Sequence, residues 1–211
     1  MKDSQRQRAL IAGVFYLLTF VSVPTLPLYN ALHDGAAAGT GVVFGAVLET
    51  VVALACIGTA VALHPTLRQR AEGRALGFVT ARVVEATLVL AGVATLLTLA
   101  ELHRSGHDPD SRPWVALYDS LFVIGQGLIP AVNAILLGSV LYQFRLVPRW
   151  LPALGLTGAP LLVAADLGIL FGAWDRFSPV VALASLPIAL WELSLGIYLI
   201  AKGPRRGPAH L

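Results

Sequence analysis

Apolar residues along the chain gather in six runs, each about as long as a helix that crosses a lipid bilayer. A spanning helix needs about 20 consecutive, mostly apolar residues. The six runs cover approximately residues 9–29, 41–63, 75–99, 114–142, 150–171 and 179–201. The polar stretches between them are too short to hold a soluble domain. The pattern predicts an all-α, polytopic integral membrane protein, with residues 1–211 forming a single transmembrane domain built as a bundle of six transmembrane helices.

Composition supports a location in the membrane. The chain is 56% hydrophobic and only 13% charged, whereas about 25% of residues in an ordinary soluble domain are charged. A soluble protein of this size needs more polar surface to cover itself, and contact with lipid removes that need. The basic residues stand between apolar runs and do not line one exposed face, so they do not indicate nucleic-acid binding. The expected partner is the lipid bilayer, with no nucleic acid.

Lysine and arginine residues concentrate in alternate polar stretches, which predicts the orientation of the chain. Short cytoplasmic loops carry an excess of these residues. If the N-terminus is cytoplasmic, that side holds most of the 15 lysine and arginine residues. The opposite side then holds Arg104, Arg112 and Arg176, and Arg82 lies within the membrane. We therefore expect both the N- and the C-terminus in the cytoplasm.

Ionisable residues also occur inside the predicted helices, where each costs about 2.5–3.5 kcal/mol at the bilayer centre. They are Glu49, Arg82, Glu85, Asp119, Asp166 and Glu192, and Gln126 and Asn133 add neutral polar groups. Seven residues make nearly two helical turns. Asp119, Gln126 and Asn133 are spaced by seven residues and therefore share one face of the fourth helix. On three other helices, Glu49, Asp166 and Glu192 share their faces with small residues. Such faces are expected at helix–helix contacts and not against lipid.

Depth in the membrane predicts which of these groups meet. At about 1.5 Å per residue, Arg82, Glu192 and Asn133 reach similar depths in the cytoplasmic half, and Glu85 and Gln126 lie near the middle. Arg82 and Glu85 are three residues apart, hence neighbours on one helix surface. We expect a core in which Arg82 pairs with Glu192 or Glu85. The predicted ligand- or ion-binding residues are Glu49, Arg82, Glu85, Gln126, Asn133 and Glu192.

The carboxylates of this predicted core outnumber its single arginine. A buried carboxylate without a cation usually becomes neutral. At least one of Glu49, Glu85 and Glu192 is therefore expected to hold a proton, a cation or water. A protein that binds or moves a small ligand, cation or proton needs such a group. A non-catalytic scaffold or sensory partner with a purely structural polar core would show the same residues, so both interpretations stay open.

Pro130 predicts a weakened turn in the fourth helix. Proline lacks the N–H that would bond the carbonyl of Gln126, and Gly125 and Gly127 flank that residue. Interrupted helices of this kind line cavities in transporters. A passive kink is the alternative.

Several kinds of site find no support. The five histidines lie in predicted loops, at helix ends or in the C-terminal tail, where they could not hold a haem between helices. A single cysteine, Cys56, excludes an internal disulfide and any multi-thiolate metal site. We expect no cofactor and no metal, and no residue stands out as a catalytic nucleophile. A membrane-embedded enzyme acting on a lipid is therefore the third interpretation. Gly41 and Gly45 have the small-xxx-small spacing of helix contacts, which leaves an oligomer open.

Five sequence stretches together resemble a known family. They are Ala12–Leu18 (AGVFYLL), Gly58–Leu67 (GTAVALHPTL), Ala81–Glu85 (ARVVE), Leu146–Trp150 (LVPRW) and Leu190–Gly196 (LWELSLG). In that order they resemble the bacterial domain-of-unknown-function family 4386, a group of multi-pass membrane proteins, over nearly the whole chain. The resemblance implies a one-domain protein of the bacterial inner (cell) membrane, and it implies no activity. Most of the residues selected above by burial lie in or near these stretches.

Overall fold

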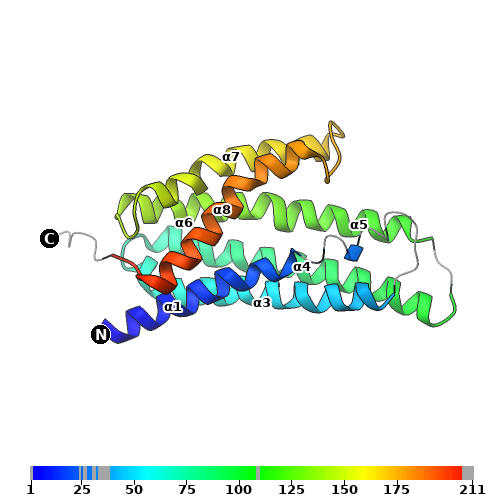
Figure 1. Ribbon diagram of the computed structural model, residues 1–211, viewed down its shortest axis with the longest axis horizontal. Helices are drawn as coiled ribbons and strands as arrows, with labels where there is room; N and C mark the ends of the chain where they lie inside the picture. The colour runs from blue at the N-terminus through cyan, green and yellow to red at the C-terminus, as the bar shows by residue number, and fades with distance from the viewer. Residues whose placement is uncertain are drawn as a thin grey trace.

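The computed structural model describes residues 2–23, 25, 28–29, 32, 39–107 and 110–205. Over these residues the chain is helical and contains no strand (Figure 1). The elements are α1 (Lys2–Leu18), the 3₁₀ helix η1 (Thr19–Ser22), α3 (Thr40–Arg68), α4 (Glu72–Arg104), α5 (Arg112–Phe122), the π-helical turn η2 (Val123–Leu128), α6 (Ile129–Gln143), α7 (Trp150–Leu170) and α8 (Pro179–Ala201). The expectation of an all-α protein is confirmed for this part of the chain.

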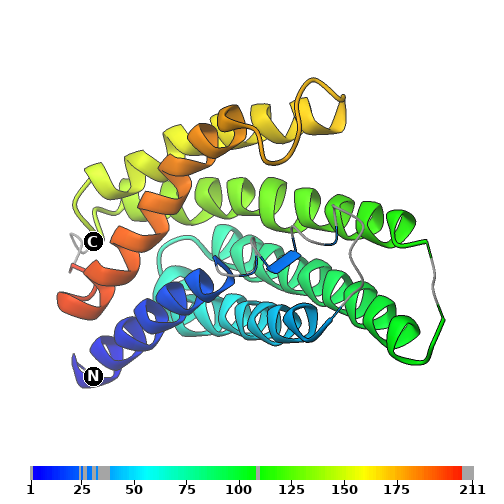
Figure 2. The ribbon, with the colours of Figure 1, turned by 45° about the vertical axis from the view of Figure 1, so that its right-hand side comes forward.

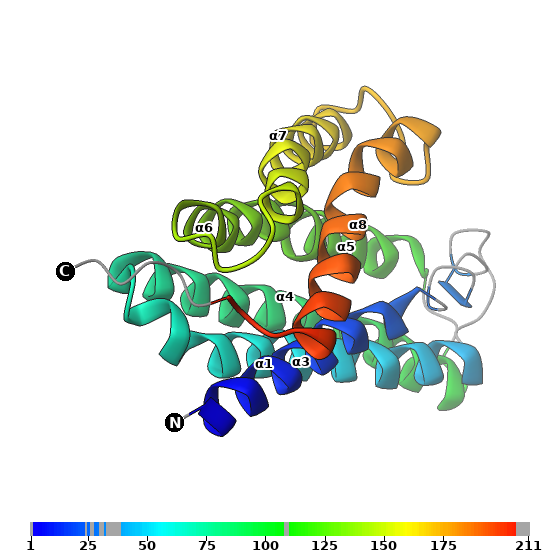
Figure 3. The ribbon, with the colours of Figure 1, turned by 60° about the vertical axis from the view of Figure 1, so that its left-hand side comes forward.

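The long helices form a bundle of antiparallel neighbours. α3 packs along α4, and α5, η2 and α6 continue one another as a single rod beside α4 (Figures 1 and 2). α7 packs on α6, and α8 then crosses the bundle from α7 to α1 (Figure 3). The beginning of α1 and the end of α8 therefore lie at the same end of the molecule. We call this the terminal end, and the other the distal end.

Two features hold the crossing of α8 over α1. The Arg6 guanidinium donates from Nη1 to the carbonyl of Leu199 at 2.8 Å, close to the C-terminus of α8, where a cation also meets the negative end of the helix dipole. Further along, a Cβ atom added to Gly13 would lie 2.7 Å from the Gly196 carbonyl oxygen. Glycine is therefore required for α1 and α8 to approach this closely.

Five of the six predicted spans match helices that are long and apolar enough to cross a membrane. These are Thr40–Arg68, Glu72–Arg104, Arg112–Gln143, Trp150–Leu170 and Pro179–Ala201. Their bounds lie within a few residues of the predicted ones, except that α3 continues to Arg68 at the terminal end and α4 continues to Arg104 at the distal end, beyond the apolar runs. The π-helical turn η2 occurs directly before the turn that contains Pro130, where the sequence predicted a weakened turn.

The first predicted helix, residues 9–29, is wrong in its bounds. α1 begins at Lys2, because the polar residues before Ala9 form helical turns against the end of α8, and its α-helix ends at Leu18. A 3₁₀ turn follows to Ser22. Prolines stand at positions 24 and 27 of the sequence, within the first predicted helix. Pro24 itself lies outside the described residues.

Candidate polar core

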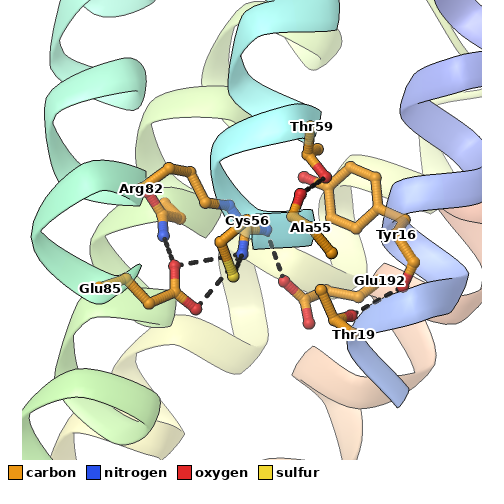
Figure 4. Close-up of polar contacts among 9 residues, drawn as sticks. Tyr16, Thr19, Ala55, Cys56, Thr59, Arg82, Glu85 and Glu192 are labelled. Atoms are coloured by element: carbon orange, nitrogen blue, oxygen red, sulfur yellow. Dashed lines mark hydrogen bonds and ion pairs between the residues drawn. The ribbon is translucent and has the colours of Figure 1, made fainter. Parts of the chain in front are cut away.

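Arg82 is the centre of a buried polar cluster. It lies on α4 with 1% of its surface exposed, and its guanidinium contacts carboxylates on two helices. Nη1 lies 3.1 Å from Oε2 of Glu85, one turn further along α4, and Nη2 lies 2.9 Å from Oε1 of Glu192 on α8 (Figure 4). The sequence left open which of the two carboxylates Arg82 contacts, and in the structure it contacts both.

Two further polar groups complete this arrangement. The side-chain amide of Asn133, fully buried on α6, donates to Oε2 of Glu85 at 2.6 Å. The Sγ atom of Cys56 on α3 lies 3.5 Å from Nη1 of Arg82 (Figure 4). Arg82, Glu85, Glu192, Asn133 and Cys56 thus bring α3, α4, α6 and α8 together, and we call them the polar core.

Aromatic rings enclose the guanidinium of Arg82. Its Cζ atom lies 5.2 Å from the ring centroid of Tyr16 on α1 and 5.7 Å from that of Phe78 on α4. A cation over the face of an aromatic ring is attracted by its quadrupole, more strongly where water is absent. The rings therefore help to hold Arg82 where it reaches both carboxylates. The Nε atom of Arg82 is buried without a hydrogen-bond partner among the described residues.

A cavity of about 200 Å³ opens beside the polar core. Arg82, Glu85 and Glu192 form its charged side, and Gln126 of η2 adds a neutral polar group. The other walls come from η1, the residue after it, α3, α6, α7 and α8: Thr19, Phe20, Ser22, Val23, Val52, Cys56, Pro130, Leu162, Ser185, Ile188 and Ala189. The side chain of Glu192 is 15% exposed, against 1% for Arg82, so its carboxylate is the more accessible member of the pair. With formal charges, two carboxylates face one guanidinium.

Two more cavities continue from this one toward the distal end. The second, about 340 Å³, shares Gln126, Leu162 and Ser185 with the first and is also lined by Asp166. The third, about 770 Å³, shares residues including Arg176 with the second and is lined by Asp119 and Asp175 near the distal loop. Because neighbouring cavities share lining residues, the three follow one another along the rod of α5, η2 and α6 and the α7–α8 pair.

Not every residue of the predicted set joins the polar core. Gln126 lines the first and second cavities, but Glu49 lies elsewhere. Glu49 is 1% exposed on α3 and accepts a hydrogen bond of 2.5 Å from the hydroxyl of Tyr118 on α5. Asp119 forms an ion pair with Arg176 near the distal end. The grouping of Arg82 with Glu85, Glu192 and Asn133 is confirmed, whereas a role in ligand or ion binding stays a prediction.

The aromatic residues that contact Arg82 and Glu49 were not predicted from the sequence. Tyr16 and Phe78 contact Arg82, and Tyr118 contacts Glu49, but a single aromatic residue within an apolar run looks like any other core residue. The sulfur of Cys56 also contacts Arg82. The spacing of Cys56 from Glu49, two helical turns away on the same face of α3, was a usable signal that both turn inward.

The fold and the buried polar core define a helical protein whose apolar segments suggest a membrane location. Within this class the chain belongs to the family described as Domain of unknown function (DUF4386), whose family model matches residues 11–203. The match covers most of the chain and confirms the resemblance seen in the five sequence stretches. No curated protein and no solved structure matches the chain.

Proposed function

We propose that this protein crosses the bacterial inner membrane six times and that its polar core binds or moves a small cationic ligand or a proton. The observation that carries the proposal is the charge of the polar core, where Glu85 and Glu192 face the single cation Arg82 beside a cavity of about 200 Å³. Buried charges are normally paired, and here one guanidinium faces two carboxylates. The surplus carboxylate favours a positively charged occupant.

The line of cavities supports access from the distal end. The acidic residues that line the three cavities are Asp119, Asp175, Asp166, Glu85 and Glu192. The basic ones are Arg176 and Arg82. A cleft lined mostly by one sign of charge raises the local concentration of ions of the opposite sign. A cation is therefore favoured along the whole line, and an anion is disfavoured.

The positions of the basic residues support a cytoplasmic terminal end. α3 ends at Arg68, and Arg145 and Arg149 lie between α6 and α7, at the same end as Arg6 and the end of α8 (Figure 1). Short cytoplasmic loops carry this excess of basic residues. α1 with η1 then provides the first of six crossings. In this orientation the cavities reach the polar core from the side opposite the cytoplasm.

Flux through proteoliposomes tests the proposal. Purified protein is reconstituted with a pH-sensitive dye inside the vesicles, and the rate of internal pH change after an external pH jump is compared with that of empty vesicles. Wild type is expected to give a flux that depends on pH, and Glu85→Gln is expected to abolish it. Glu101→Gln, at an exposed position near the distal end, is the matched control and should keep the wild-type rate. Wild-type vesicles no faster than empty ones would reject proton movement.

A scaffold function is the second candidate, and one observation favours it. Arg82 is 1% exposed and contacts groups on three other helices, Cys56 on α3, Glu192 on α8 and Tyr16 on α1, as a purely structural link would be. In that case Glu85→Gln would lower only the melting temperature and leave any flux unchanged. Measuring melting and flux on the same preparation separates the two functions.

A further inference from the structure

Asp166 is a buried carboxylate that the polar core does not include. It lies on α7, 3% exposed, and its Oδ2 atom has no hydrogen-bond partner among the described residues. Burying an ionised carboxylate without a compensating group is costly. A group in this position needs a positive charge that the neighbouring side chains do not supply.

The carboxylate lies directly against the π-helical turn. A Cβ atom added to Gly127 in η2 would lie 2.5 Å from Oδ2 and 2.8 Å from Oδ1 of Asp166. Only glycine at this position leaves room for the carboxylate. Pro130 cannot donate to the carbonyl of Gln126 one turn before it. The Asp166 carboxylate and this turn line the same cavity of about 340 Å³, together with Ser185 of α8.

The charged groups around this cavity leave Asp166 uncompensated. Arg176 lines the same cavity, but its guanidinium is paired with Asp119 and lies over the ring of Phe122, with Cζ 3.7 Å from the ring centroid. η2 offers Gln126 as its polar group, and α6 carries no acidic or basic residue. On α8 the ionisable groups are Glu192, which contacts Arg82, and Tyr198 near the terminal end.

We propose that Asp166, the π-helical turn η2 and the cavity beside them form a second site that binds one monovalent cation, supplied either as a proton or as an alkali-metal ion. The site rests on the surroundings of Asp166 and goes beyond the function proposed for the polar core. π-Helical turns inside α-helices occur frequently at functional sites. Here the turn places a backbone without a side chain against the carboxylate.

Infrared difference spectroscopy on protein in lipid nanodiscs tests the site. A protonated carboxyl group has a C=O stretching band that disappears on deprotonation and shifts in heavy water. If the cation is a proton, wild type shows such a band between acid and alkaline pH, and Asp166→Asn removes it. Asp110→Asn is the matched control, because Asp110 is an exposed carboxylate near the distal end, paired with Arg112, and this variant should keep the band.

The melting temperature at alkaline pH distinguishes the second source. An ion that binds the folded protein raises its stability in proportion to the logarithm of ion concentration above the dissociation constant. If the cation is an alkali-metal ion, replacing choline with sodium or potassium raises the melting temperature of wild type, and Asp166→Asn abolishes the rise. Asp166→Glu covers the case in which Asp166→Asn fails to fold, because it keeps the carboxyl group and should move the band or weaken the ion response. Variants identical to wild type in both measurements would overturn the proposal, whatever the flux experiment on the polar core gives.

Discussion

Nη2 of Arg82 lies 2.9 Å from Oε1 of Glu192, in an ion pair that joins α4 to α8 across 110 residues of sequence. The same guanidinium holds Glu85 through its other terminal nitrogen. The planar fork of arginine can serve two carboxylates at once, which the point charge of lysine cannot do in a fixed geometry. The bundle therefore depends on this one side chain for both its packing and the charge balance of its interior.

Replacing Arg82 with methionine is expected to destabilise the protein strongly. The change keeps much of the side-chain length but leaves Glu85 and Glu192 without their cation. Removing one partner of a buried ion pair typically costs about 3–5 kcal/mol. The melting temperature of purified Arg82→Met in detergent should therefore fall by many degrees.

Arg82→Lys tests whether charge alone is sufficient. We expect a melting temperature between those of wild type and Arg82→Met, because lysine restores the charge but not the two-sided geometry. An Arg82→Met protein as stable as wild type would show that the two carboxylates do not need this cation.

The contact between α1 and α8 predicts a difference between two glycines. Gly13→Ala would place a Cβ atom 2.7 Å from the Gly196 carbonyl, and overpacking of this kind typically costs about 1–3 kcal/mol. Gly73→Ala, in α4 with nothing within 4 Å of the added atom, should be neutral or stabilising by up to about 1 kcal/mol. Thermal melting of the two variants checks the difference. Equal effects would argue against the observed approach of α1 and α8.

Tyr118→Phe isolates the hydrogen bond to Glu49. The phenyl ring keeps the edge-to-face contact with Tyr29, whose centroid is 5.3 Å away, while the donor to Oε1 of Glu49 is lost. A buried acceptor left unsatisfied costs about 1–3 kcal/mol, so the melting temperature should fall. Tyr142→Phe, at a side chain that is 39% exposed, serves as the comparison. A fall of the same size in both variants would contradict the assignment.

Much of the interior could be predicted from the sequence because helical spacing is regular. Glu49 and Cys56, seven residues apart on α3, are both buried as that spacing requires. The meeting of Arg82, Glu85 and Glu192 could be predicted because depth follows from a rise of about 1.5 Å per residue and the helix face follows from about 3.6 residues per turn. Which carboxylate Arg82 would choose was not predictable, since that depends on side-chain torsions and on how α8 crosses the bundle.

The structure differs from the sequence predictions where the backbone leaves the regular α-helix. The first apolar run continues past Leu18, so its hydrophobic pattern gave no sign of the 3₁₀ turn there. The π-helical turn η2 changes the angular offset between Asp119 and Asn133, so the predicted single polar stripe divides. Asp119 pairs with Arg176 and Asn133 contacts Glu85. Asp166 was correctly expected to turn inward, but its contact with Gly127 depends on the packing of α7 against η2.

Labelling of single cysteines tests the proposed orientation. Cys56→Ala removes the one cysteine of the chain and provides the background. Ser105→Cys, at the distal end, should react in intact cells with a maleimide that cannot cross membranes. Gln69→Cys, exposed at the terminal end, should react only after the cells are broken. The reverse pattern would place the termini on the outer side and would contradict the cytoplasmic assignment.

The cavity beside Glu192 and Gln126 is expected to hold a positively charged occupant or the water that accompanies it. A high-resolution experimental structure of the protein in a lipid environment tests this most directly. We expect density for an ion, a ligand or ordered water within hydrogen-bonding distance of the Glu192 carboxylate, with the cavity continuing toward Asp166. Side chains packed directly against Arg82, Glu85 and Glu192 with no density between them would contradict the claim and leave the polar core a structural link between helices.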